Sequence, residues 1–156
     1  MLKVGQSAPT FDLPDGDMNA VSLSGYRGTR NVVLYFYPKD DTPGCTLEAI
    51  DFSDLQEAFL DLDTVVLGVS MDDCMSHGAF RDKHGLAVQL LADAQGEVCE
   101  QYGVLQSKEL GGKATRRGIV RSTFVIDKNG AVRHALYGVN ARGHASAVLN
   151  LVKELK

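Results

Sequence analysis

The chain has 156 residues, three cysteines and a formal net charge of −4. Its length predicts one domain over residues 1–156, large enough to fold without a disulfide framework. The acidic balance argues against nucleic acid as a partner, since phosphate binding needs a basic field. We expect no membrane association and a cytoplasmic location, because we find neither a transmembrane-length apolar stretch nor a signal peptide. The one basic cluster is expected to be solvated surface: Lys113, Arg116 and Arg117.

The first third of the chain predicts a hairpin, a buried strand and a long helix, in that order. Residues 11–23 have the pattern of two short strands around an Asp15-Gly16 turn. Residues 32–37 form an unbroken β-branched and aromatic run, which predicts a central strand buried on both faces of a parallel sheet. Pro38 ends this strand, because proline cannot donate a hydrogen bond to the ladder. From Thr46 to about Leu60, apolar residues recur at helical spacing.

The remainder of the chain continues the alternation of strands and helices. Thr64–Ser70 predicts a buried strand adjacent to the central one, and Asp72 or Asp73 can cap a helix that ends near His84. Further along we expect a short strand at 88–91, a short helix at 93–102, an irregular loop at 105–118, a hairpin of 122–127 with 131–137, and a last helix at 144–155. This order predicts an α/β fold with a central mixed sheet and helices on both faces.

Cys45 stands where the first long helix begins, after a tight loop of residues 40–44. A thiol at a helix N-terminus meets unpaired N–H groups and the positive end of the helix dipole, and both favour the thiolate. In open α/β sheets, chemistry gathers at the carboxyl ends of strands, and this loop follows such an end. The alternative is an inert buried thiol. The chain has no Cys-x-x-Cys pair, which a thioredoxin-type dithiol exchanger requires.

The motif Pro38-x-x-x-Thr42-x-x-Cys45 resembles the peroxidatic loop of the peroxiredoxins. The longer string 37–48, YPKDDTPGCTLE, is similar to the peroxiredoxin Q branch, also called bacterioferritin comigratory protein, and the likeness continues through 11–14, 67–70 and 121–127. The resemblance implies a thioredoxin-like fold with peroxiredoxin additions, among them the N-terminal hairpin. It also implies a thiol-dependent peroxidase without a bound cofactor or metal, acting on hydroperoxides and recycled by thioredoxin or a glutaredoxin-like protein. The expected assembly is a monomer or a weak dimer.

The resemblance assigns a role to each residue of the site. Cys45 would attack the O–O bond as a thiolate and become a sulfenic acid, and the Thr42 hydroxyl would face the same pocket. Pro38 would shield the thiolate from water. Arg121 would stabilise the thiolate and hold a peroxide oxygen, with Glu48 orienting that arginine. Each residue also has an ordinary reading: a loop-capping threonine, a proline that ends a strand, a surface arginine and a first-turn helix acid.

The sulfenic acid must then be reduced, and here the sequence departs from its branch. Members that carry a second cysteine have it five residues after the first, where this chain has Ile50, or in the next helix, where the matching position is Arg81. Cys74, at the start of that helix, is the candidate for the resolving thiol. A disulfide needs Cα atoms within about 7 Å, so local unwinding would be required. Cys99 is expected to be a buried core thiol, and it is a less favoured candidate than Cys74 for the resolving role.

Three alternatives remain open. The first is a one-cysteine peroxidase that an external thiol reduces directly. The second is a metal site, since cysteine and histidine suit zinc and Cys74, His77 and His84 fall on one predicted helix. The third is a non-catalytic thioredoxin-like binding module.

Overall fold

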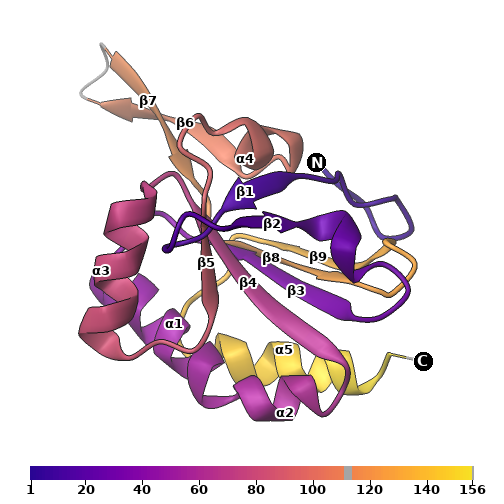
Figure 1. Cartoon of the computed structure of the whole chain (residues 1–156). Coiled ribbons are helices and arrows are strands. Elements are labelled where there is room, and N and C mark those ends of the chain that lie inside the picture. The colour runs from indigo at the N-terminus through magenta and orange to yellow at the C-terminus, as the bar shows by residue number, and fades with distance from the viewer. Residues whose placement is uncertain (111–113, 156) are drawn as a thin grey trace.

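The computed structural model describes residues 1–110 and 114–155, and for 107–110 and 114–117 it describes the backbone alone. Figure 1 shows a central sheet with helices packed against it. In chain order the elements are β1 (Asp12–Pro14), β2 (Ala20–Ser22), the 3-10 helix η1 (Leu23–Tyr26), β3 (Asn31–Phe36), α1 (Pro43–Asp54), α2 (Gln56–Leu60), β4 (Thr64–Ser70), α3 (Cys74–His84), β5 (Gln89–Ala92), α4 (Glu97–Gln101), β6 (Leu105–Leu110), β7 (Ala114–Ile119), β8 (Ser122–Ile126), β9 (Val132–Tyr137) and α5 (His144–Lys153).

The central sheet is five-stranded, in the order β5-β4-β3-β8-β9. Strand β3 lies at its centre, parallel to β4 and antiparallel to β8, with Val33 opposite Val66 on one side and Val125 on the other. The predicted central strand and its predicted neighbour Thr64–Ser70 are therefore confirmed. The sheet is mixed rather than parallel around β3, because β8 runs antiparallel to it.

Alternate residues of β3 supply two hydrophobic clusters, one on each face of the sheet. Val33 and Tyr35 belong to the cluster beneath α1, α2, α3 and α5, whereas Val32, Leu34 and Phe36 belong to the cluster beneath the β1–β2 hairpin and α4. Helices thus lie on both faces, as predicted. The amino-terminal hairpin is also confirmed, with Leu13 opposite Val21.

Three sequence predictions were wrong in extent or kind. The predicted helix from Thr46 starts earlier, at Pro43, because proline suits the first helical turn, and it breaks at Leu55 into α1 and α2. The helix expected at 93–102 is only Glu97–Gln101, because the Asp93 carboxylate accepts hydrogen bonds from the amides of Val98 and Cys99.

The third error is the irregular loop expected at 105–118, which is the hairpin β6–β7, with Leu105 opposite Ile119. These two strands pair only with each other and extend away from the central sheet (Figure 1). Most of their residues are polar, so the segment lacks the apolar alternation of a half-buried strand. The predicted basic cluster lies outside the described side chains: Lys113, Arg116 and Arg117.

Gly68 lies against the ring of Tyr35, its neighbour in the adjacent strand. They are register partners in β3 and β4, and a Cβ atom on Gly68 would lie 2.6 Å from Tyr35 Cζ. The Tyr35 ring also stacks on Phe52 of α1, with the ring centroids 4.7 Å apart. Glycine at position 68 therefore makes room for the ring that fixes α1 on the sheet.

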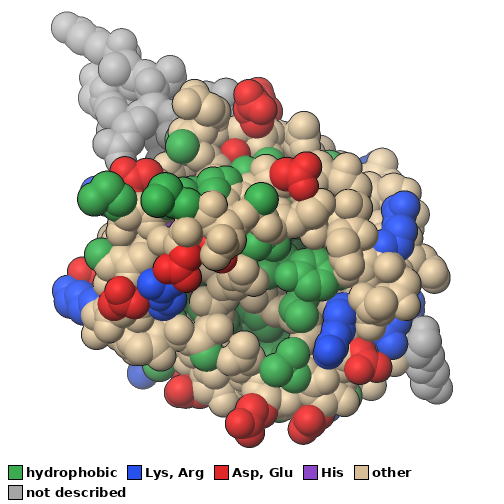
Figure 2. All heavy atoms as spheres, viewed as in Figure 1, with side chains coloured by type: hydrophobic (Ala, Val, Ile, Leu, Met, Phe, Trp, Pro, Cys, Tyr) green, Lys and Arg blue, Asp and Glu red, His purple; other side chains and the backbone are tan. Residues whose placement is uncertain are grey.

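Figure 2 shows the face over β4 and β5, which is hollowed and has apolar side chains on its floor. A cavity of about 290 Å³ lies on this face, with Tyr26, Leu60, Val65, Arg81 and Gln89 among its lining residues. It follows the amino-terminal half of β4 and reaches His77 of α3. Among the described residues, no helix is long and apolar enough to cross a membrane.

Candidate active site

Cys45 lies in the first turn of α1, directly beyond the carboxyl end of β3. Thr42 is the residue that caps the helix, with extended backbone angles, and Pro43 occupies the first helical turn. The backbone N–H groups of this turn have no partners further back in the helix, so they present positive charge to the sulfur. The thiol is only 1% exposed. The helix start predicted for Cys45 is confirmed, and the thiol is held away from bulk water.

Arg121 approaches Cys45 from the start of β8, the strand that lies next to β3. Strand β8 begins with Ser122 opposite Phe36, so the residue before it arrives at the carboxyl end of β3. The Arg121 carbonyl is held by the amide of Val139 at 2.9 Å. Its Nη2 atom lies 3.3 Å from Cys45 Sγ, and its Nη1 atom donates to Glu48 Oε1 at 2.5 Å. The guanidinium group of Arg121 therefore contacts the Cys45 and Glu48 side chains of α1 at the same time.

Glu48 is fully buried one turn after Cys45, on the side of α1 that faces the sheet. Burial raises the pKa of its carboxyl group, and the nearby Arg121 opposes this effect, leaving the pKa at about 7. Its second oxygen, Oε2, has no hydrogen-bond partner, and among the described side chains the buried Tyr35 hydroxyl is also without one. The pair Glu48–Arg121 thus places a titratable carboxyl group at the back of the thiol site.

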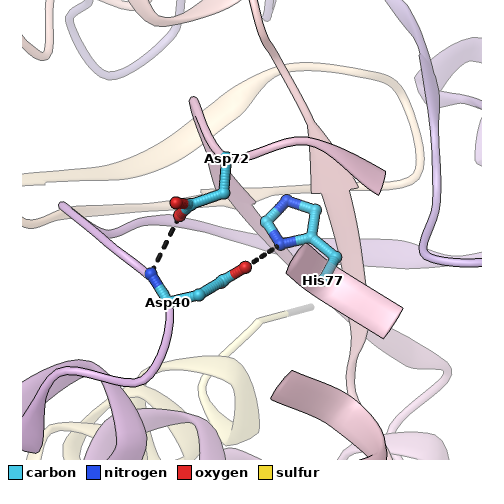
Figure 3. Close-up of side chains that lie close together, drawn as sticks. All are labelled: Asp40, Asp72 and His77. Carbon is cyan, nitrogen blue, oxygen red and sulfur yellow. Dashed lines mark hydrogen bonds and ion pairs between the residues drawn. The ribbon is translucent and has the colours of Figure 1, made fainter. Parts of the chain in front are cut away.

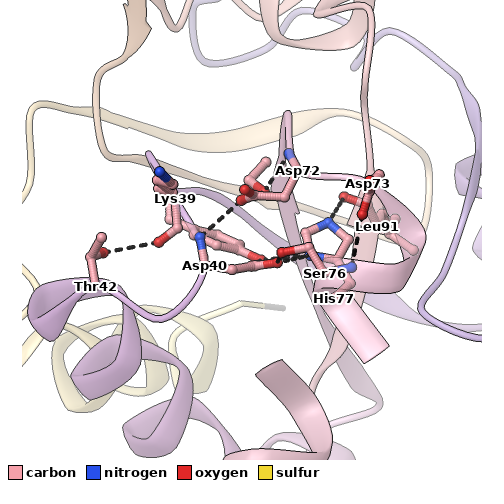
Figure 4. A network of polar contacts seen from close by, with 10 residues as sticks. Lys39, Asp40, Thr42, Asp72, Asp73, Ser76, His77 and Leu91 are labelled. Carbon is pink, nitrogen blue, oxygen red and sulfur yellow. Dashed lines mark hydrogen bonds and ion pairs between the residues drawn. The ribbon is translucent and has the colours of Figure 1, made fainter. Parts of the chain in front are cut away.

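The remaining loop residues differ in how they are placed. The Thr42 hydroxyl donates a hydrogen bond to the Lys39 carbonyl at 2.9 Å (Figure 4). This hydrogen bond is the one expected of a loop-capping threonine. It leaves the Thr42 hydroxyl oxygen able to accept a further hydrogen bond. Pro38 is exposed and follows the end of β3, as expected of a residue that terminates a strand.

The other two cysteines lie in different environments. Cys74 is the first residue of α3 and is partly exposed, next to Asp73, whose side chain caps the helix. Cys99 is fully buried in α4, as predicted, and burial together with the neighbouring Asp93 carboxylate raises the pKa of its thiol well above the usual range. All three cysteines are free thiols.

A buried polar network joins the loop before Cys45 to α3, and the sequence analysis did not foresee it. Asp40 accepts hydrogen bonds from Tyr37, Ser76 and His77, and its amide donates to Asp72 at 2.8 Å (Figures 3 and 4). Two signals in the sequence were available: a carboxylate two residues before Thr42, and a histidine in the first turn of the next helix.

The same network bears on the alternative of a metal site at Cys74, His77 and His84. His77 is hydrogen-bonded to Asp40 and the Leu91 carbonyl, whereas His84 contacts Asp41, so the two histidines face different partners. In the part of the chain that the structure describes, the candidate ligand group is instead Asp40, Asp72 and His77, whose donor atoms lie within 4.8 Å of one another. Protein hydrogen bonds already engage these donor atoms (Figure 3), which is the pattern of a satisfied network rather than of a cation site.

The sequence and the fold of the chain both match known proteins. The sequence model of the AhpC/TSA family matches residues 4–135, and the chain belongs to this family, which contains the peroxiredoxins. It is 42% identical over 154 residues to peroxiredoxin Bcp of Bacillus subtilis, covering 99% of this chain and 97% of that one. It is 40% identical over 153 residues to peroxiredoxin Bcp of Escherichia coli, covering 98% and 97%.

Solved structures agree. Peroxiredoxin Q of Xanthomonas campestris superposes with a TM-score of 0.87 at 38% identity, covering 92% of this chain and 89% of that one. Peroxidoxin BcpB of Mycobacterium tuberculosis gives 0.88 at 33% identity, covering 100% and 99%. A further structure concerns alkyl peroxide reduction by the X. campestris bacterioferritin comigratory protein. The predicted thioredoxin-like fold, the peroxiredoxin Q resemblance and the predicted activity of a thiol-dependent peroxidase are confirmed by these relatives.

Proposed function

We propose that Cys45 is the thiol that attacks the hydroperoxide, with Arg121 as its principal electrostatic partner. The single observation that carries this assignment is the 3.3 Å contact between Arg121 Nη2 and Cys45 Sγ, at a buried helix start. A fixed guanidinium in a water-poor site stabilises both the thiolate and the negative charge that develops as the O–O bond stretches. Glu48 holds the guanidinium in this orientation through its charge-assisted hydrogen bond.

The reaction balances with these groups and one proton from solvent. The Cys45 thiolate attacks the terminal oxygen of R–O–OH, the O–O bond breaks, and the sulfur becomes sulfenic acid while the alkoxide leaves and takes a proton from solvent. The Thr42 proton is committed to the Lys39 carbonyl, so its oxygen accepts a hydrogen bond from the hydroperoxide O–H and directs that oxygen towards the sulfur. Pro38 shields the thiolate at the mouth of the loop.

We assign the second step to Cys74. Its thiol attacks the Cys45 sulfenic acid, water leaves, and a dithiol of the thioredoxin or glutaredoxin type reduces the resulting disulfide by exchange. Support comes from the partial exposure of Cys74 and from the hydrogen bonds that tie the loop before Cys45 to the first turn of α3. The competing mechanism has no intramolecular disulfide, and an external thiol reduces Cys45 directly.

One experiment separates these mechanisms. Fully reduced protein is treated with one equivalent of hydrogen peroxide, and its intact mass and peptide map are measured. We expect the loss of two hydrogens and a cross-linked Cys45–Cys74 peptide. A gain of oxygen at Cys45 with Cys74 still open to alkylation would establish the one-cysteine mechanism. A disulfide between Cys45 and Cys99 would show that Cys99, not Cys74, is the resolving thiol. An unmodified Cys45 would show that Cys45 is not the peroxidatic thiol.

We also propose that residues 1–156 act as one domain in the cytoplasm, as a monomer or weak dimer. The two hydrophobic clusters share one sheet, which supports a single cooperative unit, and three free thiols suit a reducing compartment. A single unfolding transition seen by two probes, together with sedimentation analysis of the reduced protein, tests the domain and assembly proposals.

A further inference from the structure

The carboxylate of Asp40 is the centre of the buried network beside the candidate site. It is 8% exposed and accepts three hydrogen bonds, from the Tyr37 hydroxyl at 2.6 Å, the Ser76 hydroxyl at 2.8 Å and His77 Nδ1 at 2.7 Å. Figure 4 shows Asp40, in the loop after β3, facing Ser76 and His77 in the first turn of α3. Such a well-satisfied carboxylate is fixed in position, and it fixes the backbone that carries it.

His77 is the partner of Asp40 from α3. The ring is fully buried, its Nε2 atom lies 2.9 Å from the Leu91 carbonyl, and its Nδ1 atom faces the Asp40 carboxylate. When Asp40 is ionised, the carboxylate and the carbonyl both only accept hydrogen bonds, so a doubly protonated ring satisfies both partners. In that state His77 and Asp40 form a buried ion pair with its atoms 2.7 Å apart.

This ion pair joins the two segments that the reaction needs. Asp40 lies two residues before Thr42 and five before Cys45, and His77 lies three residues after Cys74. The next loop residue, Asp41, is also tied to α3, through Lys83 and His84, but all three side chains of that contact are partly exposed. Exposed ion pairs contribute little to stability, so the buried pair of Asp40 and His77 is the contact that holds the loop.

We propose that His77 is a positioning residue for peroxide reduction: through Asp40 it holds the loop that carries Thr42 in the conformation that reacts with hydroperoxide. This inference rests on the proposed role of Cys45. The physical reason is the cost of an unpaired buried carboxylate, which is far larger than the net contribution of the intact pair. When the imidazolium is removed, Asp40 gains by moving to water, and the loop moves with it. A displacement of about 1 Å near reacting groups can cost 10²-fold in rate.

The test is a double-mutant cycle on His77 and Asp40, measured as the second-order rate constant for Cys45 oxidation by hydrogen peroxide. Quenched flow with alkylation and mass analysis gives this rate without a tryptophan signal, which the chain lacks. H77F keeps a ring but removes the charge and both hydrogen bonds, and we expect the rate to fall about tenfold or more. D40N removes the charge but keeps the shape, because the asparagine amide can donate to Nδ1 of a neutral imidazole, and we expect a smaller loss of rate than in H77F.

The double variant H77F/D40N distinguishes positioning from packing. If the unpaired carboxylate displaces the loop, removing its charge restores most of the rate that H77F loses. A packing defect would leave the double variant as slow as H77F, and that result would overturn the proposal. Deuterium exchange supplies a second readout: we expect faster uptake in a peptide spanning 38–48 of H77F, with unchanged uptake in one spanning 122–137.

Three controls complete the design. H84Q removes the other histidine that binds this loop from α3, and its rate should stay within about twofold of wild type. Y37F removes one hydroxyl donor to Asp40 without changing the ring, so it tests the proposal with a smaller expected loss if H77F does not fold. C45S tests the underlying assignment: peroxide reduction by C45S would refute the role of Cys45. Inactive C45S with wild-type rates and exchange in folded H77F or Y37F would overturn only the role of His77.

Discussion

The Nη2 atom of Arg121 lies 3.3 Å from the Sγ atom of Cys45, although 76 positions separate the two residues in the chain. The contact depends on two strands that run in opposite directions, because β3 ends where β8 begins. Helix α1 then turns the thiol back towards this point. The site therefore forms at the centre of the sheet, where the end of β3 meets the start of β8. Substitutions that disturb the contact made there should impair the reaction.

Arg121→Lys should lower the rate of Cys45 oxidation by hydrogen peroxide by about 10²-fold, the usual cost of losing one preorganised donor. A single ammonium group cannot contact Cys45 and Glu48 with the fork geometry of a guanidinium. Single-turnover oxidation of reduced protein measures the effect. Arg133→Lys is the matched control, since Arg133 is 40% exposed and pairs with Asp127 at 3.5 Å. Equal rates for Arg121→Lys and the control would refute this prediction.

Glu48 should make stability depend on pH. Burial raises its pKa from the ordinary value of 4.5 to about 7, so between these values the folded protein keeps a proton that the unfolded chain has released. Stability therefore falls as pH rises through this window. Relative to Glu48→Gln, wild type should lose roughly 2–3 kcal/mol between pH 5 and pH 8. Urea denaturation of the reduced proteins at both pH values measures this difference, and a constant difference would contradict it.

The three thiols should differ in native reactivity. Cys99 is fully buried, and both burial and Asp93 raise its pKa, so it should be the slowest of the three to react with iodoacetamide at pH 8. Cys74 is the partly exposed thiol and should react without unfolding. Timed alkylation followed by peptide mapping ranks the three sites. The same labelling in denaturant is the control, because the differences should disappear there.

Gly68→Ala should destabilise the fold by about 1–3 kcal/mol, the usual cost of overpacking a core. The new methyl group would lie 2.6 Å from Tyr35 Cζ and 2.8 Å from its hydroxyl oxygen, in a ring that is fully buried and stacked on Phe52. Gly25→Ala adds the same group where nothing lies within 4 Å, and it should be neutral. The denaturant concentrations at the unfolding midpoints of the two variants test this prediction. Equal midpoints would show that the Tyr35 ring moves aside without cost.

The sequence was most informative where local patterns and tertiary structure agree. The strand Thr64–Ser70 was predicted to the residue, because its β-branched run is buried on both sides. The position of Cys45 at the beginning of a helix was also predicted, although α1 starts two residues earlier, at Pro43. Arg121 could be named only through the family resemblance, because no local pattern reports a contact across the sheet.

The features that sequence reasoning missed have a common physical cause. The β6–β7 hairpin forms a two-stranded sheet of its own, and most of its residues are polar, so its sequence resembled a loop. Asp40 and His77 meet across 37 positions, and each has an ordinary local reading as a turn acid or a helix histidine. Hydrogen bonds between distant polar side chains leave no periodic trace in a sequence.

The antiparallel pairing of β3 with β8 also sets when the site can form during synthesis. The thiol leaves the ribosome well before its guanidinium, and at ordinary rates of translation the interval between them is roughly 4–15 s. During that time the nascent chain carries an ordinary cysteine without its activating cation. We expect peroxide chemistry to begin only once β8 has joined the sheet, so that the thiol is spared oxidation while the chain is still incomplete.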